Sequence, residues 1–445
     1  MVNDMTKGNP LKLIISFAVP MLIGNVFQQV YNFVDAAVVG RFVGANALAA
    51  IGATGGIFGV LISWMMGLTG GGGIIISQCF GMGDFKKMRR IVTGLIYIVA
   101  VMSVIIAFLG VMFSRAMLLA LGTPESVLPD AVQYTRIMFM FVAGMAFYNL
   151  SSSVLRSLGD SKTPLYALII ASVLNVLLDL RFVVVFKAGV TGAGIATIIA
   201  QTLSAVYCVV HMVKRRKELN LENIPVKTDR KILKTIIRAG LPGAFESCMI
   251  SLGGMSVQRL VNSFGAAAMA AYTASTKIDS VAIAPIISVA NAISVYTGQN
   301  MGAGNVKRIK KGLYQSLGLL IGVCVVITSL IVIFRYRLLG LFLDASQAQE
   351  AIEIGSQYLT IVCVAYIVAA CMRSYLNVLR GAGDVNTSAV AGMTELIGRI
   401  IFAYILVRPF GVTGIWIATP IAWSMGAIVP IVRYYSGKWM SKRLV

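Results

Sequence analysis

Polar side chains recur at helical spacing within the first long apolar segment of the chain. Gln28, Asn32 and Asp35 are separated by four and three residues, so one face of a helix would carry all three. Tyr31 flanks this stripe. A carboxyl group inside a membrane is costly and usually serves a function. The pattern predicts a polar site at Asp35, with Gln28, Tyr31 and Asn32 as candidates for lining a substrate cleft.

Two further polar stripes lie in the same half of the chain. Asn175 and Asp179 are four residues apart on one apolar segment, and Thr197 and Gln201 are four apart on the next. Three such stripes can converge on one wet pocket that holds a cation between two carboxylates. A proton would relieve the repulsion between like charges, and Na⁺ would suit the oxygen ligands equally well. The residues alone leave H⁺ or Na⁺ open, as they do a purely structural role for these hydrogen-bonding groups. We add Gln201 to the cleft candidates.

The second half of the chain carries intramembrane charges of both signs. These residues are Glu246, Lys277, Asp279, Arg373, Glu395 and Arg399. Glu395 and Arg399 are four residues apart, which would place them on one helical face. Glu246 and Asp279 are further candidates for lining the substrate cleft. Lys277, Arg373, Glu395 and Arg399 should form a network of internal ion pairs with a structural or gating role.

The composition is that of a membrane protein. The 445 residues are 58% hydrophobic and 12% charged, against roughly 45–50% and 25% in an average soluble domain. Apolar stretches of about 20 residues or more are long enough to cross a bilayer. They cover 12–38, 46–76, 91–114, 131–154, 163–185, 190–212, 235–261, 269–297, 312–334, 351–377, 387–407 and 412–432. We predict an all-α polytopic membrane protein with twelve transmembrane helices.

The distribution of lysines and arginines along the chain predicts its orientation in the membrane. The formal net charge is +21, and most of the 38 lysines and arginines fall in alternate connections that share a side with both chain ends. Such an excess marks the cytoplasmic side, so we expect both termini in the cytoplasm and a multi-pass location in the inner (plasma) membrane. Anionic membrane lipids are the expected counter-charge, and nucleic acid is not an expected partner. The six cysteines form no CxxC pair and are expected to be core residues.

The two halves of the sequence repeat each other. Gly189–Thr197 matches Gly411–Thr419 at seven of nine positions, and Val154–Asp160 matches Val378–Asp384 at five of seven. A near-constant offset between separated segments indicates an internal repeat. We predict an N-lobe over 1–212, a cytoplasmic linker over 213–234 and a C-lobe over 235–445. Six helices per lobe give a pseudo-two-fold axis along the membrane normal and a central cleft suited to alternating access.

Several motifs resemble those of the multidrug and toxic compound extrusion (MATE) family, across nearly the whole chain. The first half carries Pro20-Met21-Leu22, Gln28-Gln29-Val30-Tyr31-Asn32-Phe33-Val34-Asp35, Gly81-Met82-Gly83-Asp84 and Asn175-Val176-Leu177-Leu178-Asp179. The second half carries Asn262-Ser263-Phe264-Gly265, Lys277-Ile278-Asp279 and Gly298-Gln299-Asn300-Met301-Gly302. The resemblance implies a cation-coupled exporter of cationic or aromatic small molecules, with a cation site at Asp35, Asn175, Asp179 and Thr197. The tenth span has no acid in its interior, which disfavours the C-lobe sodium site of some relatives.

Secondary active efflux by cation (H⁺ or Na⁺)/drug antiport is therefore the expected function. A flippase for a lipid-linked or amphipathic metabolite, from the same superfamily, is the alternative. An enzyme is not expected, because the chain has one histidine and no HExxH, GxSxG or phosphate-binding loop. We expect a monomer without a cofactor and without a metal site, apart from possible Na⁺ at the four residues of the cation site.

Overall fold

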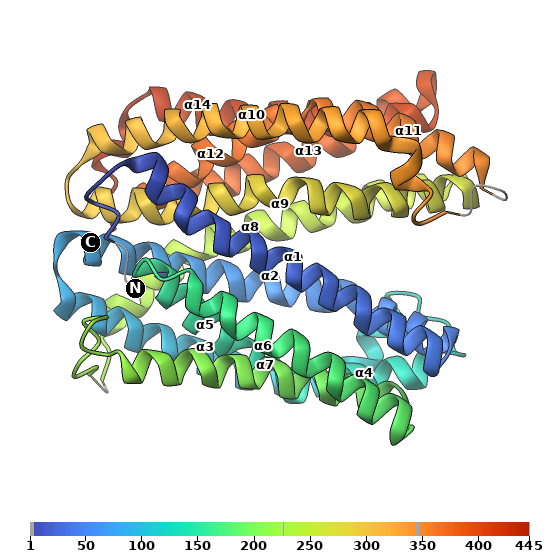
Figure 1. Cartoon of the computed structure of the whole chain (residues 1–445), viewed down its shortest axis with the longest axis horizontal. Helices are drawn as coiled ribbons and strands as arrows, with labels where there is room; N and C mark the ends of the chain where they lie inside the picture. Colours follow the sequence, from blue (N-terminus) through green and yellow to red (C-terminus); the bar gives the residue numbers. More distant parts are fainter. Residues whose placement is uncertain (1–3, 226, 344–347, 445) are drawn as a thin grey trace. The chain divides into compact units, whose positions relative to one another are not determined.

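The computed structural model describes residues 4–225, 227–343 and 348–444, and within them it is all-helical (Figure 1). The first half comprises α1 (Pro10–Phe42), α2 (Ala45–Met82), α3 (Phe85–Ala120), α4 (Leu128–Met140), α5 (Val142–Ser157), α6 (Lys162–Asp179), the π-helix η1 (Leu180–Val185) and α7 (Gly189–Lys214). The second comprises α8 (Arg230–Asn262), α9 (Ala266–Gly302), α10 (Val306–Leu339), α11 (Gln349–Val364), α12 (Tyr366–Ala382), α13 (Asn386–Phe410), α14 (Val412–Tyr435) and the 3₁₀-helix η2 (Lys438–Ser441).

Each predicted span corresponds to one helix or to one pair of consecutive helices. In the described part of the chain, nine helices are long and apolar enough to cross a membrane, or up to eleven when the bent pairs α4–α5 and α11–α12 each count as one span. The bends are 49° and 45°. The one predicted span not included among these eleven, 235–261, corresponds to α8, which is 33 residues long but carries basic residues and Glu246. The prediction of an all-α, multi-pass membrane protein is confirmed.

The chain divides into two compact units. The first contains Asp4 and the described residues of Val19–Gly240, and the second contains Met5–Ala18 and the described residues of Leu241–Val445. Both α1 and α8 therefore begin in one unit and continue into the other. Each crossing lies just before a proline inside the helix, Pro20 in α1 and Pro242 in α8. The lobes expected over 1–212 and 235–445, with a linker over 213–234, remain a prediction.

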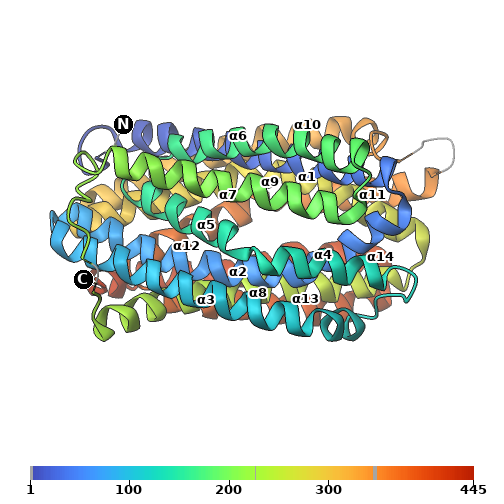
Figure 2. The same ribbon diagram turned by 90° about the horizontal axis from the view of Figure 1, so that it is seen from below.

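The first unit places α7 beside both α5 and α6, and Figure 2 shows α6 and α7 side by side. The start of α8 packs closely on α2 in this unit. A Cβ atom on Gly71 would lie 2.3 Å from the backbone nitrogen of Gly240, so only glycine allows the two backbones to approach. This unit holds α6 and α7, which carry the second and third polar stripes.

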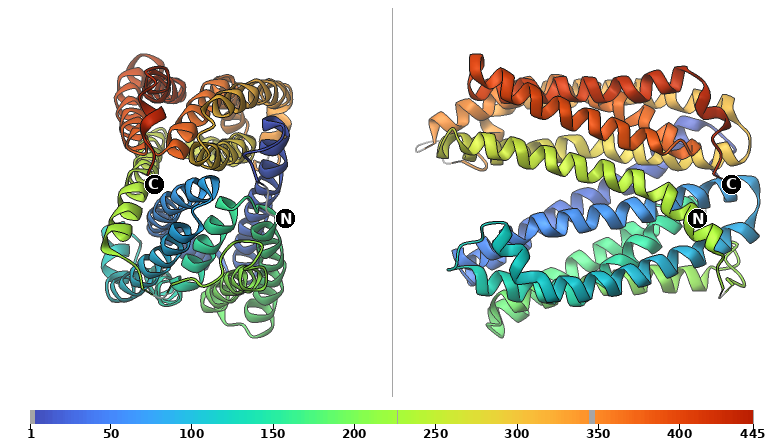
Figure 3. Two further views of the ribbon diagram at one scale, coloured as in Figure 1. Left: turned by 90° about the vertical axis from the view of Figure 1, so that its left-hand side faces the viewer. Right: turned by 180° about the vertical axis from the view of Figure 1, so that it is seen from behind.

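The second unit is built around α9, α12 and α14. Helix α9 packs on α10, α11 and α12, and α14 packs on α11, α12 and α13; Figure 3 shows α13 and α14, coloured orange to red, running together. Met5 is fully buried in this unit, where its backbone N–H donates to Gln299 Oε1 at 2.9 Å and its carbonyl accepts from Asn300 Nδ2 at 3.0 Å. The residues before α1 are thus fixed to the end of α9.

Candidate functional site

The two acids predicted on α1 and α6 meet inside the first unit. The carboxyl groups of Asp35 and Asp179 lie within hydrogen-bonding distance of each other. Asp179 is fully buried, and Asp35 is half-buried. The Oδ1 atom of each is buried and has no hydrogen-bond partner among the described residues. Two carboxyl groups this close need a positive charge between them, either as a proton or as a bound cation.

Asn175 and Thr197 hold this pair from the side. With its amide NH₂ turned toward Asp179, the fully buried Asn175 donates to Asp179 Oδ2 at 2.9 Å and accepts from the backbone N–H of Thr197 at 3.2 Å. The Tyr31 hydroxyl donates to Thr197 Oγ1 at 3.4 Å. The structure thus brings together the four residues predicted for the cation site, together with Tyr31.

A wider helical turn follows the site on α6. Leu180–Val185 form the π-helix η1 directly after Asp179, and the Phe186 N–H donates to the carbonyl of Arg181, five residues earlier, at 3.0 Å. Such turns are rare and occur often at functional sites. The guanidinium of Arg181 lies 5.6 Å from the centroid of the Phe186 ring. Within the described residues, Asp179 forms no ion pair with it.

Sequence reasoning missed Tyr134, on α4. This buried phenol is close enough to interact electrostatically with Tyr31, Asp35 and Asp179. It belongs to an apolar cluster that includes Val38, Val39, Ala47, Val183, Val190 and Ala193. The cluster lowers the local dielectric beside the two acids, which strengthens their interaction with any cation. No pattern in the sequence distinguishes this tyrosine from other aromatic residues of a membrane helix.

The remaining first-half cleft candidates differ in exposure. Gln28 and Asn32 are exposed on α1, and Tyr31 is half-buried. Gln201 is buried on α7, one turn after Thr197. These side chains extend the polar face around the acid pair. Among these candidates, Tyr31 is the one with a hydrogen bond to Thr197 of the cation site in the described part of the chain.

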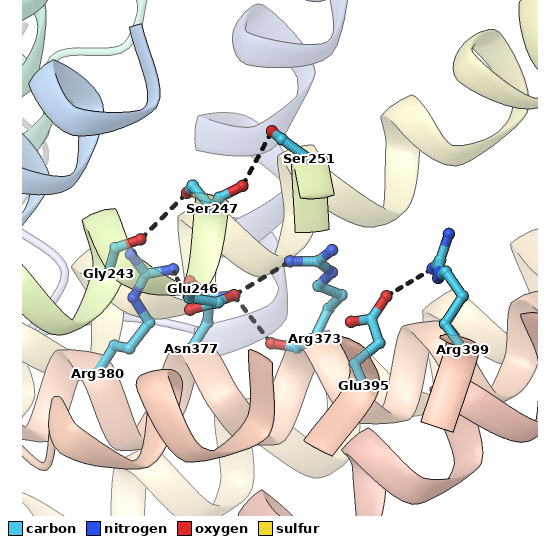
Figure 4. Close-up of polar contacts among 9 residues, drawn as sticks. All are labelled: Gly243, Glu246, Ser247, Ser251, Arg373, Asn377, Arg380, Glu395 and Arg399. Atoms are coloured by element: carbon cyan, nitrogen blue, oxygen red, sulfur yellow. Dashed lines mark hydrogen bonds and ion pairs between the residues drawn. The ribbon is translucent and has the colours of Figure 1, made fainter. Parts of the chain in front are cut away.

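Glu246 and Glu395 belong to two separate ion clusters of the second unit (Figure 4). Glu246 on α8 is buried between two arginines of α12, with Oε1 3.3 Å from Arg373 Nη1 and Oε2 3.7 Å from Arg380 Nη1. Glu395 and Arg399 form their own pair on α13 at 2.6 Å. Arg380 was missed by the sequence analysis. The signal was available, because it lies seven residues after Arg373 on the same helical face.

The other two predicted charges of this unit lie outside these clusters. Asp279 on α9 accepts a hydrogen bond from the Tyr366 hydroxyl at 2.6 Å. Lys277 is exposed and forms no ion pair with the described residues. Its position two residues before Asp279 directs the two side chains to different sides of α9. The single network expected from the sequence is thus resolved into separate contacts.

Comparison with known proteins places the chain among transporters. The MatE family model matches residues 20–180 and again residues 242–405, and each range begins at one of the two equivalent prolines, Pro20 and Pro242. "Probable multidrug resistance protein YpnP" of Bacillus subtilis (strain 168) is 30% identical over 449 residues, covering 99% of this chain and 98% of that protein. "Probable multidrug resistance protein YoeA" of the same organism is 29% identical over 438 residues, covering 96% and 94%. A solved outward-facing multidrug resistance MATE family transporter has a TM-score of 0.91 at 23% identity, covering 98% of both chains.

Proposed function

Because the chain belongs to the MATE family of multidrug efflux transporters, we propose that it exports small molecules by antiport with a cation bound between Asp35 and Asp179. The protein is a transporter and not an enzyme. The observation that supports the coupling site is the pair of carboxyl groups within hydrogen-bonding distance, each with a buried oxygen that lacks a partner among the described residues. A buried acid pair can take up a positive charge from one side of a membrane and release it on the other.

A proton suits this site better than Na⁺. Sodium requires several free oxygen ligands, as hard cations do. The Asn175 side-chain oxygen already accepts from the Thr197 N–H, and Thr197 Oγ1 already accepts from Tyr31. A proton needs only the two carboxyl groups themselves. We therefore favour proton coupling over sodium coupling.

The transport cycle follows from the charge of the acid pair. In the outward-open state a proton enters the site, neutralises one carboxylate and rearranges the first lobe, which expels the substrate. In the inward-open state the proton leaves to the cytoplasm and substrate binds again. Lobes over 1–212 and 235–445 would move as bodies around a central cleft. We propose a monomer in the inner membrane, with both termini cytoplasmic, surrounded by membrane lipids.

The proposed substrates are cationic or aromatic compounds. Gln28, Tyr31, Asn32 and Gln201 provide polar groups near the acid pair, and an acidic site attracts cations. A flippase for a lipid-linked or amphipathic metabolite is the second candidate, and one observation favours it. Arg373 and Arg380 in the second unit offer the basic groups that a phosphate-bearing lipid would require. The acid pair of the first unit supports the antiporter instead.

Reconstituted protein tests the proposal directly. Purified chain in proteoliposomes is given a cationic aromatic dye and either a pH gradient or a Na⁺ gradient alone. Dye movement driven by the pH gradient, and lost in Asp35→Asn, is the expected result. Movement driven by Na⁺ alone would contradict proton coupling, and movement of a lipid-linked saccharide without either gradient would favour the flippase.

A further inference from the structure

The buried carboxylate of Glu246 has more positive charge around it than it can neutralise. Its side chain is 4% exposed, and the guanidinium groups of Arg373 and Arg380 lie 3.3 Å and 3.7 Å from its two oxygens. All three side chains belong to the second unit (Figure 4). One carboxylate between two guanidinium groups leaves a net charge of +1. A cation site at Glu246 is therefore unfavourable.

The hydrogen-bonding capacity of the two arginines is largely unused. A guanidinium has five N–H donors. Within the described residues, the Arg373 side chain makes one hydrogen bond, to Glu246 Oε1, and the Arg380 side chain makes none. Glu246 Oε2 is buried and accepts no hydrogen bond from a described residue. The side chains of Arg373 and Arg380 are 27% and 23% exposed, so a ligand can reach them.

The neighbouring pair Glu395–Arg399 shows what a closed ion pair looks like in the same unit. Its two charges are balanced one to one, its atoms are 2.6 Å apart, and its side chains are 5% and 14% exposed. In such a pair each charge is neutralised by its partner, and the low exposure leaves little access for a ligand. The cluster at Glu246 differs in each respect: unbalanced charge, longer distances and more exposed donors.

We propose that Arg373 and Arg380 bind the carboxylate group of a transported aromatic molecule, which Glu246 imitates when no such molecule is bound. This inference rests on the proposed export function and assigns the residues that would recognise a carboxylate beside the aromatic or cationic part of a substrate. Glu246 shows that this arginine pair accepts a carboxylate. Two guanidinium groups seven residues apart on one face of α12 form a fork for both oxygens of such a group.

A purely structural role for the cluster makes a different prediction. If the three residues only link α8 to α12, removing any of them lowers stability and changes binding of all ligands alike. A binding role instead gives opposite effects for the acid and the two bases. Removing the carboxylate of Glu246 frees the fork for a ligand, whereas removing either arginine weakens it.

Two dyes that differ in one group separate these possibilities. Rhodamine 110 carries a free carboxylate, and rhodamine 123 is its methyl ester. Binding is measured by fluorescence polarisation on the full chain in phosphatidylcholine nanodiscs, so that the bilayer supplies no net anionic lipid. We expect Arg373→Gln and Arg380→Gln each to raise the Kd for rhodamine 110 about tenfold while the Kd for rhodamine 123 changes less than about twofold. Glu246→Gln should lower the Kd for rhodamine 110 several-fold.

Glu395→Gln is the matched control, because it removes a buried, arginine-paired carboxylate from the same unit. It should leave the ratio of the two affinities unchanged. Should a glutamine variant of either arginine fail to fold, Arg373→Lys and Arg380→Lys keep the charge but lose the planar fork. They are expected to weaken binding of the acid dye by a smaller factor.

The outcomes distinguish this inference from the function on which it rests. Equal effects on both dyes, or no arginine-dependent binding of rhodamine 110, overturn the carboxylate site even if the protein exports rhodamine 123 under a pH gradient. Arginine-dependent binding of rhodamine 110 supports the site. If neither dye is then moved under any ion gradient, the failure belongs to the proposed export function.

Discussion

The first and second units use equivalent positions for different charges. When the repeated segments of the two halves are aligned, Asp35 and Asp179 correspond to Val257 and Ala403, and Asn175 corresponds to Arg399. Thr197 corresponds to Thr419. The second unit thus lacks both acids of the proposed cation site and holds a fixed positive charge where the first has an amide. The shared scaffold does not carry a shared site, so we place the proposed cation coupling in the first unit alone.

The helix that carries Asp179 differs between the units as well. Helix α6 begins at Lys162 and α13 at Asn386, which are equivalent positions in the repeat. The chain after Asp179 winds into the π-helix η1, whereas α13 continues as an α-helix to Phe410. The wider turn is therefore found beside the acid pair and not at the equivalent place of α13, which associates the irregular backbone with the proposed coupling site rather than with the repeat.

Removing the acid on α1 should have the largest effect. Asp35→Asn keeps the size of the side chain but loses the charge that a proton neutralises, so we expect coupled dye efflux to fall about 100-fold or more, the effect of about 3 kcal/mol on a coupling step. Efflux from proteoliposomes and drug resistance of an efflux-deficient host measure this. The control is Asp279→Asn, which removes an intramembrane acid of the second unit and should reduce efflux less than about fivefold. Equal losses in the two variants would contradict the difference between the units.

The two acids should behave as one group. Asp179→Asn is expected to abolish coupling to a similar degree, and the double variant with Asp35→Asn should be no worse than either single variant. Residues that act together give such strongly non-additive effects. Efflux rates of the wild type, the two single variants and the double variant form a double-mutant cycle that measures this. Losses that multiply in the double variant would show that the acids work independently.

The fold was predictable from sequence because each membrane helix requires a long, continuous apolar segment, which is visible in the sequence itself. Twelve apolar stretches with polar breaks located each helix or helix pair. The bends were not predicted, because Ala365 has no proline or glycine beside it and Phe141 has only Gly144, three residues later. The polar stripes at helical spacing on α1, α6 and α7 predicted a shared polar pocket, and the resemblance to the MATE family selected the four residues of the proposed cation site. Tyr134 and the π-helix were not, because each depends on packing that an apolar sequence does not specify.

The charges of the second unit were harder to assign. The sequence placed Arg373 beside Glu395 and Arg399 in one network, whereas the structure pairs it with Glu246 on α8, a helix distant in the chain. Residue spacing indicates contacts along one helix but not the choice of partner between helices. The i,i+4 pair Glu395–Arg399 was accessible to sequence reasoning for this reason.

An intermediate effect is expected from the threonines at equivalent positions. Thr197→Val removes the hydroxyl that accepts from Tyr31 but keeps the backbone N–H that donates to Asn175. We expect efflux to fall about fivefold to tenfold, the value of one hydrogen bond of about 1 kcal/mol. Thr419→Val in the second unit should change efflux less than about twofold. A larger effect at Thr419 would show that the second unit contributes to coupling after all.

The smallest expected effect is on thermal stability, and it concerns an aspartate that is present at equivalent positions in both units. Asp160 and Asp384 each follow a glycine with positive φ, but Asp160 lies 3.5 Å from His211 Nε2, and Asp384 lies 2.5 Å from Arg433 Nε. His211 and Arg433 are themselves equivalent positions in the aligned repeat. An imidazole is largely neutral above about pH 6.5, whereas a guanidinium keeps its charge.

Replacing His211 by arginine therefore gives the first unit the permanent ion pair of the second. At about pH 8 we expect His211→Arg to raise the thermal midpoint by about 1–3 °C, because a partly exposed ion pair contributes about 1 kcal/mol or less. At a lower pH, where the wild-type histidine has taken up a proton, it pairs with Asp160 itself, so the difference between the two proteins in unfolding temperature should shrink. Thermal unfolding of the detergent-solubilised chains at both pH values measures this, with Arg433→His as the reverse exchange. A gain that is equal at the two pH values would mean that the charge of His211 does not stabilise this end of the first unit.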